Sequence, residues 1–273
     1  MDNSKINLGS LQETLLLPLW GRAMETQKPK PLLVDELAVY IVNNIGYNFN
    51  KIAKEINPLS RLAWIARSVY FDKKIRVFLE KYPVGSIVNI GCGLDTTFNR
   101  VDNGRSTWYE LDLPDVIELR RKYIREESRR IFISQSVFND SWYSRIINKK
   151  NVLFLLAGVI YYFEEEKIKT FFKNISDYFI NTTILFDYCS KKGLKVANKK
   201  VIEKGGMNSQ ADLIWGIDNI YEIEKWDSRI RVIGNIKMFE HHKKNYPFYQ
   251  RIGMNISDFM KIMSLAQVEI SSV

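Results

Sequence analysis

Cysteine and histidine, the residues most used in redox chemistry and metal binding, are scarce in this sequence. Among 273 residues there are two cysteines, Cys92 and Cys189, and two adjacent histidines, His241 and His242. Two cysteines are too few for a disulfide framework. Two neighbouring histidines leave little material for a metal site built from histidine and cysteine. We therefore expect a metal-free protein of the cytoplasm.

Long hydrophobic runs are also missing. The longest, residues 152–163, is twelve residues long, whereas a membrane-spanning helix needs about 20. The first ten residues do not show the cationic and then apolar pattern of a secretion signal. Apolar residues nevertheless make up 46% of the chain and charged residues 26%. This composition excludes a disordered or low-complexity protein and predicts a folded core.

The net charge of +9 raises the question of an anionic partner such as nucleic acid or a membrane. The basic residues are spread along the chain, and the densest clusters are residues 120–130 and 191–204. Both clusters are typical of solvated helix faces or loops. We therefore expect neither a nucleic-acid nor a membrane partner. The sequence does not indicate an oligomeric state.

The first third of the chain is helical in pattern. Residues 33–45 repeat apolar side chains at the spacing of one helix face, and Gly46 follows as a stop signal. Residues 62–82 repeat the pattern and end before Pro83. We expect helices throughout residues 11–80.

From residue 86 onward, strand-like and helix-like segments alternate. Such alternation predicts an open, mainly parallel α/β sheet whose ligand lies beyond the carboxyl ends of the strands. Predicted strands are residues 86–90, 107–111, 130–134, 151–157 and 183–188, with predicted helices at residues 114–128, 142–148 and 164–180. In the remainder we expect helices at residues 220–226 and 256–265, an extended segment at residues 229–239 and a terminal strand at residues 267–273.

A Gly-x-Gly turn closes the first predicted strand at Gly91 and Gly93. Glycines at such a turn let the backbone approach a ligand closely. The third glycine of the dinucleotide fingerprint is absent, because Thr96 stands in its place, and Asp95 would repel a pyrophosphate. A ligand without phosphate, such as S-adenosylmethionine, therefore suits this turn better than a nicotinamide dinucleotide.

Two acids, Glu110 and Asp112, stand at the end of the second predicted strand, about 20 residues after the turn. Residues two apart on a strand share a face, so both carboxylates are candidates to accept hydrogen bonds from a ribose. The competing interpretation is an exposed strand end with solvated acids.

Three motifs together resemble one protein family. GCGLDTTF begins at Gly91, ELDLP begins at Glu110 and LLAGVIYYF ends at Phe163. They are similar to the leucine carboxyl methyltransferase-like family, in its branch of bacterial O-methyltransferases that resemble the tetracenomycin polyketide enzyme. The resemblance covers most of residues 11–190. It implies a class I S-adenosylmethionine-dependent methyltransferase fold, an α/β Rossmann-like sheet with an N-terminal helical cap and an inserted lid.

The resemblance also implies roles for individual residues at the cofactor. Arg67 matches the arginine that holds the methionyl carboxylate and lies close to the acceptor, although a surface helix arginine is the alternative. Gly91 and Gly93 match the cofactor turn, and Asp112 matches the ribose-binding acid ahead of Glu110. The segment that flanks adenine corresponds to Ser136, Val137 and Phe138, with Asp140 as the nearest acid where many members carry one.

At the reacting end, the resemblance points to the fourth-strand motif. Gly158 matches the glycine of this motif. Tyr162 matches a tyrosine that reaches the active site. The alternatives are that Tyr162 is a core aromatic or that Tyr161 points inward instead. Ala157 stands where the family usually has glutamate. That departure predicts altered cofactor contacts and altered substrate choice.

The resulting prediction is an S-adenosylmethionine-dependent O-methyltransferase acting on a carboxylate or acidic hydroxyl of a small molecule, polyketide-like or another secondary metabolite. A carboxylate acceptor needs no base, whereas an alcohol or phenol does, and Tyr162, Asp187 or a water are the candidates to assist. One alternative is a protein carboxyl methyltransferase with residues 191–204 lining a peptide groove, and another is a non-catalytic cofactor-binding protein. We expect one domain with a helical cap (1–82), a cofactor-binding core (83–190), a lid insertion (191–228) and closing strands with a helix (229–273).

Overall fold

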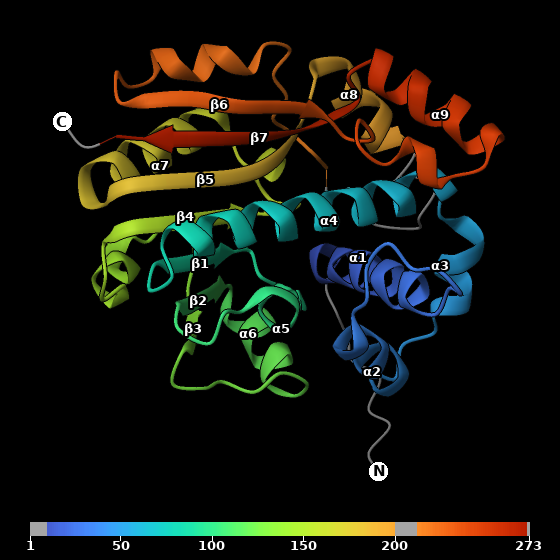
Figure 1. Cartoon of the computed structure of the whole chain (residues 1–273), viewed down its shortest axis with the longest axis horizontal. Coiled ribbons are helices and arrows are strands. Elements are labelled where there is room, and N and C mark those ends of the chain that lie inside the picture. Colours follow the sequence, from blue (N-terminus) through green and yellow to red (C-terminus); the bar gives the residue numbers. More distant parts are fainter. Residues whose placement is uncertain (1–9, 200–211, 272–273) are drawn as a thin grey trace.

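A seven-stranded sheet forms the centre of the computed structural model, which describes residues 10–199 and 212–271 (Figure 1). The strand order is β3-β2-β1-β4-β5-β7-β6. The strands are β1 (Ser86–Ile90), β2 (Thr107–Asp112), β3 (Arg130–Ser134), β4 (Lys150–Leu156), β5 (Ile180–Cys189), β6 (Ile230–Lys237) and β7 (Met263–Ile270). Strands β1 to β5 are parallel, and β7 is antiparallel to both β5 and β6. The predicted α/β sheet is therefore confirmed, including the late strand pair at its edge.

The strand order reverses at β1. After β1 the chain adds β2 and β3 on one side, and then returns to add β4 and β5 on the other side. Ligands in open α/β sheets bind outside the carboxyl ends of the strands at such a reversal. The glycine turn after β1 therefore lies where this topology places a ligand site.

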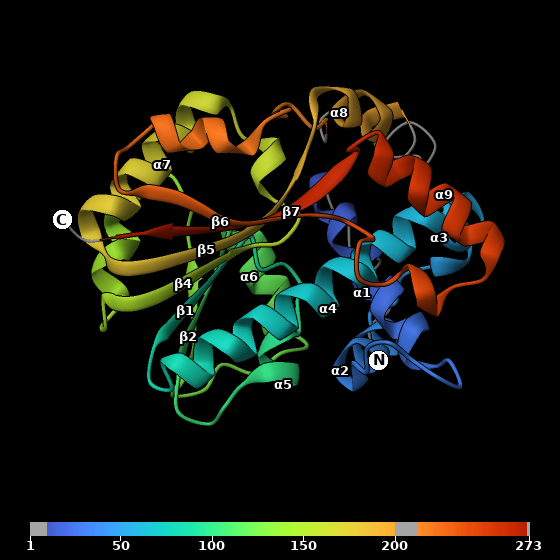
Figure 2. The ribbon, with the colours of Figure 1, turned by 45° about the horizontal axis from the view of Figure 1, so that its top comes forward.

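Helices cover both faces of the sheet. They are α1 (Ser10–Thr26), α2 (Glu36–Asn44), α3 (Phe49–Glu55), α4 (Pro58–Lys81), α5 (Thr97–Val101), α6 (Pro114–Arg121), α7 (Glu165–Tyr178), α8 (Lys191–Ala197) and α9 (Phe248–Phe259). Short 3-10 helices span Asp140–Arg145, Ile160–Tyr162, Ile220–Lys225 and Lys243–Asn245. Figure 1 shows α4 crossing one face of the sheet, and Figure 2 shows α7 on the opposite face.

The two largest clusters of the core lie on opposite faces of the sheet, and a third joins α1 and α2 to α6. Ile87 and Leu153 pack with α4, while their chain neighbours Val88 and Phe154 pack with α7. Alternate residues of a strand point to opposite faces. All four side chains are fully buried, which is why these strands are apolar along their whole length.

Four predicted helices differ from the structure. The one expected at residues 220–226 is the 3-10 helix Ile220–Lys225. The helix expected at residues 114–128 ends at Arg121, and the one expected at 142–148 is the 3-10 helix Asp140–Arg145. The prediction of a helix at residues 256–265 is wrong in its bounds, because α9 ends at Phe259 and β7 begins at Met263. Lys261 has a φ of 49°, a left-handed conformation that interrupts the helix. The apolar residues of the predicted helix therefore belong to two elements.

Candidate active site

A cavity of about 440 Å³ lies at the carboxyl ends of β1 and β4, between α1 and α4. Its size is within the range of small-molecule sites. Of the residues predicted from the sequence, those that line it are Arg67, Gly91, Gly93, Asp112, Ser136, Val137, Phe138, Gly158 and Tyr162. The fold thus brings together residues from five separate segments at one site. Glu110 is the predicted site residue that does not line it.

The turn after β1 has the geometry that requires glycine. Gly91 has a φ of 62°, and its backbone N–H donates to the carbonyl of Leu111 at 2.8 Å. A Cβ atom at this position would lie 2.6 Å from Cγ2 of Val159. Both the backbone conformation and the close neighbour therefore exclude a side chain here. The turn keeps the backbone open toward the cavity.

Asp112 ties the end of β2 to this turn. Its carboxylate accepts hydrogen bonds from the backbone N–H of Gly93 at 2.7 Å and of Leu113 at 2.8 Å. Burial raises the pKa of the Asp112 carboxyl to about 6, although these two N–H groups act to lower it. The carboxylate therefore lies beside the turn, at the position that accepts ribose hydroxyls in such sheets.

Glu110 has a different environment, and the expectation that both acids point into the crevice is wrong. Its side chain is 1% exposed, and its two oxygens form ion pairs with Arg120 and Arg130. The structure separates the two acids because Glu110 lies inside the sheet between α6 and β3, whereas Asp112 is the last residue of β2. Only Asp112 remains a candidate for the ribose.

Arg120 donates hydrogen bonds to the backbone of the glycine turn, a role that the sequence did not indicate. Its guanidinium is fully buried and donates to the carbonyls of Gly93 at 2.6 Å and Asp95 at 2.8 Å. Burial lowers the pKa of Arg120 to about 10, so the side chain remains protonated at neutral pH. Residues 120–130 were expected to form a solvated face, yet Arg120 and Arg130 are both buried because they neutralise Glu110.

Arg67 reaches the cavity from α4. It is 6% exposed, and its Nη1 is 2.7 Å from a carboxylate oxygen of Asp187. Burial acts to lower the pKa of Arg67, but Asp187 and the hydroxyl of Tyr161 outweigh it and raise the pKa above its usual value. The surface-arginine interpretation is therefore wrong, because this guanidinium is buried, charged and held in place at the cavity wall.

Asp187 places a carboxylate beside Ala157, the position where the family usually has glutamate. Strands β4 and β5 pair Leu156 with Phe186, so the next residues, Ala157 and Asp187, are neighbours at the strand ends. The Asp187 carboxylate accepts the backbone N–H of Gly158 at 2.6 Å. A carboxylate from the adjacent strand thus lies beside the position where the family usually has glutamate.

Gly158 leaves the space that Arg67 occupies. Its φ is 81°, and a Cβ atom there would lie 2.7 Å from Nη1 of Arg67 and 3.2 Å from the hydroxyl oxygen of Tyr161. Any larger residue would displace the guanidinium from Asp187. Gly158 therefore acts through its lack of a side chain.

Tyr161 and Tyr162 both line the cavity, with ring centroids 5.2 Å apart. Tyr161 is buried and Tyr162 is half-buried. Burial raises the pKa of Tyr161 well above its usual value, so its hydroxyl stays protonated and can donate a hydrogen bond. The carbonyl of Tyr161 also accepts the N–H groups of Ile214 and Trp215, at 2.8 and 3.0 Å. The chain after residue 211 is thereby anchored at the site.

The segment expected to flank adenine follows β3. Ser136, Val137 and Phe138 line the cavity, and the ring of Phe138 packs edge-on against Phe163 with centroids 4.7 Å apart. Asp140 begins a 3-10 helix and does not line the cavity. The apolar wall formed by these side chains suits a flat heterocycle, whereas the acid that many relatives use there is absent from the wall.

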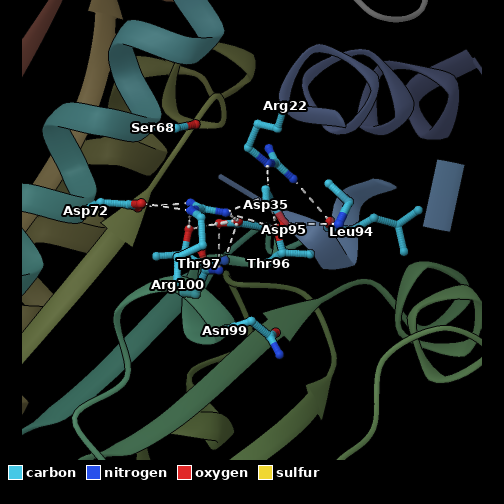
Figure 3. A network of polar contacts seen from close by, with 12 residues as sticks. Arg22, Asp35, Ser68, Asp72, Leu94, Asp95, Thr96, Thr97, Asn99 and Arg100 are labelled. Atoms are coloured by element: carbon cyan, nitrogen blue, oxygen red, sulfur yellow. Dashed lines mark hydrogen bonds and ion pairs between the residues drawn. The ribbon is translucent and has the colours of Figure 1, made fainter. Parts of the chain in front are cut away.

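A buried network of charges joins the helical cap to the turn (Figure 3). Arg22 of α1 pairs with Asp35 at 2.8 Å and donates to the carbonyl of Leu94 at 3.4 Å. Arg100 of α5 pairs with Asp35 at 2.8 Å and with Asp72 of α4 at 2.8 Å. These contacts connect α1, α4 and α5 around the cavity mouth, so the cap is a fixed wall of the site.

Two further findings concern what the described residues do not contain. In residues 10–199 and 212–271, no group of three or more histidine, cysteine or acidic side chains is placed to bind a metal. Across the same part of the chain, no helix has the length and apolarity needed to cross a membrane.

The parallel sheet, the glycine turn after β1 and the acid after β2 define the fold of a class I S-adenosylmethionine-dependent methyltransferase. Within that class, the chain belongs to the leucine carboxyl methyltransferase family, whose model matches residues 16–176. The protein is an enzyme of that class, and its cofactor is S-adenosyl-L-methionine.

Named relatives agree with this assignment. The chain is 26% identical over 220 residues to the tetracenomycin polyketide synthesis O-methyltransferase of Streptomyces glaucescens, covering 80% of each protein. It is also 26% identical over 243 residues to an S-adenosyl-L-methionine-dependent methyltransferase of Gibberella zeae, covering 82% of this chain and 81% of the relative.

Solved structures show the same fold. A Thermobifida fusca protein described as a methyltransferase superimposes with a TM-score of 0.58 at 13% identity, covering 93% of this chain and 94% of that one. The plantazolicin methyltransferase, solved with S-adenosylhomocysteine, superimposes with a TM-score of 0.51 at 14% identity, covering 96% and 100% of the two chains.

The residues around the cavity fit this cofactor. The backbone of Gly91 and Gly93 lines the cavity without side chains, and Asp112 offers a carboxylate acceptor beside the turn. Arg67 offers a buried cation on the same cavity wall, suited to a carboxylate. Asp95 also lies at the turn, where its negative charge would repel a pyrophosphate.

Proposed function

We propose that this enzyme methylates a carboxylate or an acidic hydroxyl of a small molecule. The bound cofactor supplies a methyl group activated on a sulfonium. In this proposal Asp112 accepts the ribose hydroxyls, Ser136 to Phe138 flank the adenine, and Arg67 holds the methionyl carboxylate. The protein's own contribution is then to orient the two reactants and exclude water.

The observation that carries the proposal is that the described part of the cavity wall offers no histidine and no readily ionised thiol, while Asp112, whose pKa is about 6, is assigned to the ribose in this proposal. His241 and His242 do not line the cavity. Burial raises the pKa of the Cys92 thiol to about 12 and that of Tyr161 well above its usual value. An acceptor that is already an anion at neutral pH needs no proton removed, so these side chains favour a carboxylate or an acidic hydroxyl.

Two other acids, Asp95 on the wall and Asp187 beside Arg67, are already engaged. Burial acts to raise the pKa of Asp95, but Arg22 and Arg100 outweigh it and hold the pKa below its usual value. A carboxylate of such low basicity is a poor proton acceptor. Asp187 is occupied by Arg67 and by the N–H of Gly158, so it serves as a positioning group.

The wall favours an aromatic acceptor. Besides the two tyrosines, four large aromatic side chains line the cavity: Trp64, Phe71, Phe138 and Phe163. Aromatic rings pack on one another in edge-on or offset geometry with a gain beyond their buried area. A polyketide-like ring system carrying an acidic oxygen fits this surface, and the named relative from Streptomyces glaucescens acts in polyketide synthesis.

A product assay tests the proposal directly. The enzyme is incubated with methyl-labelled cofactor and, in separate reactions, aromatic carboxylic acids, acidic phenols and ordinary phenols. We expect labelled product from the first two classes. Mild alkali then separates the outcomes, because methyl esters release labelled methanol and methyl ethers do not. Faster methylation of ordinary phenols than of either acidic class would contradict the proposal.

A further inference from the structure

Helix α9 carries an apolar face that points to solvent. Its exposed large side chains are Phe248, Tyr249, Ile252, Ile256 and Phe259, with Phe248 75% and Phe259 87% exposed. At 100° per residue these five positions fall within an arc of about 100°. We call them the α9 stripe. Figures 1 and 2 show α9 at the periphery, with no described helix or strand beyond it.

The opposite face of α9 is firmly packed. Met254 is fully buried in the core layer that contains α4, and Asp258 is buried in an ion pair with Lys243 at 2.9 Å. The helix is therefore fixed in its orientation, and the α9 stripe cannot turn inward without breaking these contacts. The α9 stripe is exposed because the packing of Met254 and Asp258 fixes the orientation of the helix.

The five side chains of the α9 stripe together expose a large apolar area. Single exposed apolar residues are common, but a group of five, on the order of 500 Å², is as large as the largest apolar patch of a typical monomer, and such patches often serve a function. The sequence did not indicate this stripe, because the helix expected at residues 256–265 combined the last turn of α9 with the first residues of β7.

The charges around α9 indicate what it contacts. Lys244, Arg251 and Lys261 are exposed and form no ion pair with another described residue, and the whole chain has a net charge of +9. A two-fold contact uses the same patch on both copies, so a second copy of the chain would bring an equally cationic surface to α9. An anionic surface would be attracted to these cations.

We propose that α9 docks this enzyme on the surface of an anionic membrane, with the α9 stripe inserted among the headgroups. Aromatic and aliphatic side chains on one face with cations at the margins are the signature of an interfacial helix. The stripe supplies apolar contact, and the cations supply attraction to the lipid charge. The proposal differs from the expectation of no membrane partner, because that expectation rested on the spread of basic residues along the sequence and not on their position around α9. It is independent of which acceptor the enzyme methylates.

Sedimentation with lipid vesicles tests the proposal, with the full-length protein and no added substrate. We expect binding to phosphatidylglycerol vesicles at low salt, at least tenfold weaker binding to phosphatidylcholine vesicles, and release in high salt. The double variant Phe248→Ser/Phe259→Ser should lose at least tenfold of the binding. Lys244→Gln/Lys261→Gln should weaken binding to phosphatidylglycerol alone. Ile147→Ser, at an isolated residue that is 85% exposed, is the matched control and should bind as wild type does.

Three results would overturn the proposal. The first is equal sedimentation of wild type and the phenylalanine double variant, including no binding by either. The second is a concentration-dependent dimer in solution that the double variant abolishes, which would assign the stripe to a second copy. The third is a melting temperature several degrees below that of Ile147→Ser, which would show that the chain itself covers the stripe.

Discussion

The carboxylate of Asp187 lies 2.7 Å from the guanidinium of Arg67, although the two residues are 120 positions apart in the chain. Each comes from a different layer, Arg67 from α4 and Asp187 from the end of β5. The same carboxylate holds the backbone N–H of Gly158. One buried acid thereby sets the position of a helix side chain and of a loop at the reacting end of the site.

Arg67→Lys should weaken cofactor binding while the fold survives. Lysine keeps the charge beside Asp187 but loses the planar fork that can hold Asp187 and a second carboxylate together. We expect the affinity for S-adenosylhomocysteine to fall about tenfold, or about 1.4 kcal/mol, by calorimetry. Arg76→Lys, an exposed position on the same helix, is the control. Equal affinities for Arg67→Lys and wild type would contradict a carboxylate clamp.

Asp112 should make cofactor affinity depend on pH. The pKa of its carboxyl is about 6 without ligand, and the ribose hydroxyls require the ionised form as acceptor. Binding therefore releases the proton, so affinity should be constant above pH 7 and fall by up to about tenfold per pH unit below 6.

The variant Asp112→Asn separates this effect from other titrations. It should bind S-adenosylhomocysteine more weakly than wild type at pH 8, by about 1.5–3 kcal/mol, the range for a hydrogen bond to a charged group. The dependence between pH 5 and 7 should disappear in the variant. A variant that retains the wild-type pH profile would show that another group is responsible.

Tyr162→Phe and Tyr161→Phe should differ in their effects. The Tyr162 hydroxyl is proposed to orient the acceptor, so its loss should lower kcat about tenfold and leave S-adenosylhomocysteine affinity nearly unchanged. The Tyr161 hydroxyl instead contacts Arg67, so its loss should lower stability by about 1 kcal/mol. Steady-state kinetics and denaturant unfolding on both variants measure the difference. The reverse pattern would mean that Tyr161 faces the acceptor.

Arg120→Met should destabilise the protein strongly. The variant leaves Glu110 short of one partner and removes the donors to the carbonyls of Gly93 and Asp95. Breaking a buried ion pair from one side costs about 3–5 kcal/mol, measurable by urea unfolding. Arg121→Met, at the exposed neighbour on α6, should change stability by less than about 0.5 kcal/mol. Similar losses in both variants would remove the special role given to Arg120.

Local patterns in the sequence predicted the strands of this protein and its parallel sheet. The β-branched run closed by Gly91 predicted β1 with its observed bounds, Ser86–Ile90, and the alternation of strands and helices predicted the parallel sheet. Such features depend on neighbours within a few residues, which the sequence displays directly. The spacing from the glycine turn likewise predicted that Asp112 lines the cavity, because parallel strands bring their carboxyl ends to one edge.

Only the tertiary structure decided which charges are buried and which apolar residues are not. Glu110 and Asp112 are two positions apart, yet one is enclosed by arginines and the other lines the cavity. The pairing of Arg67 with Asp187 and the solvent exposure of the α9 stripe also follow from contacts between distant segments. Burial and charge pairing are properties of the space around a side chain, and that space is created only when segments far apart in sequence pack together.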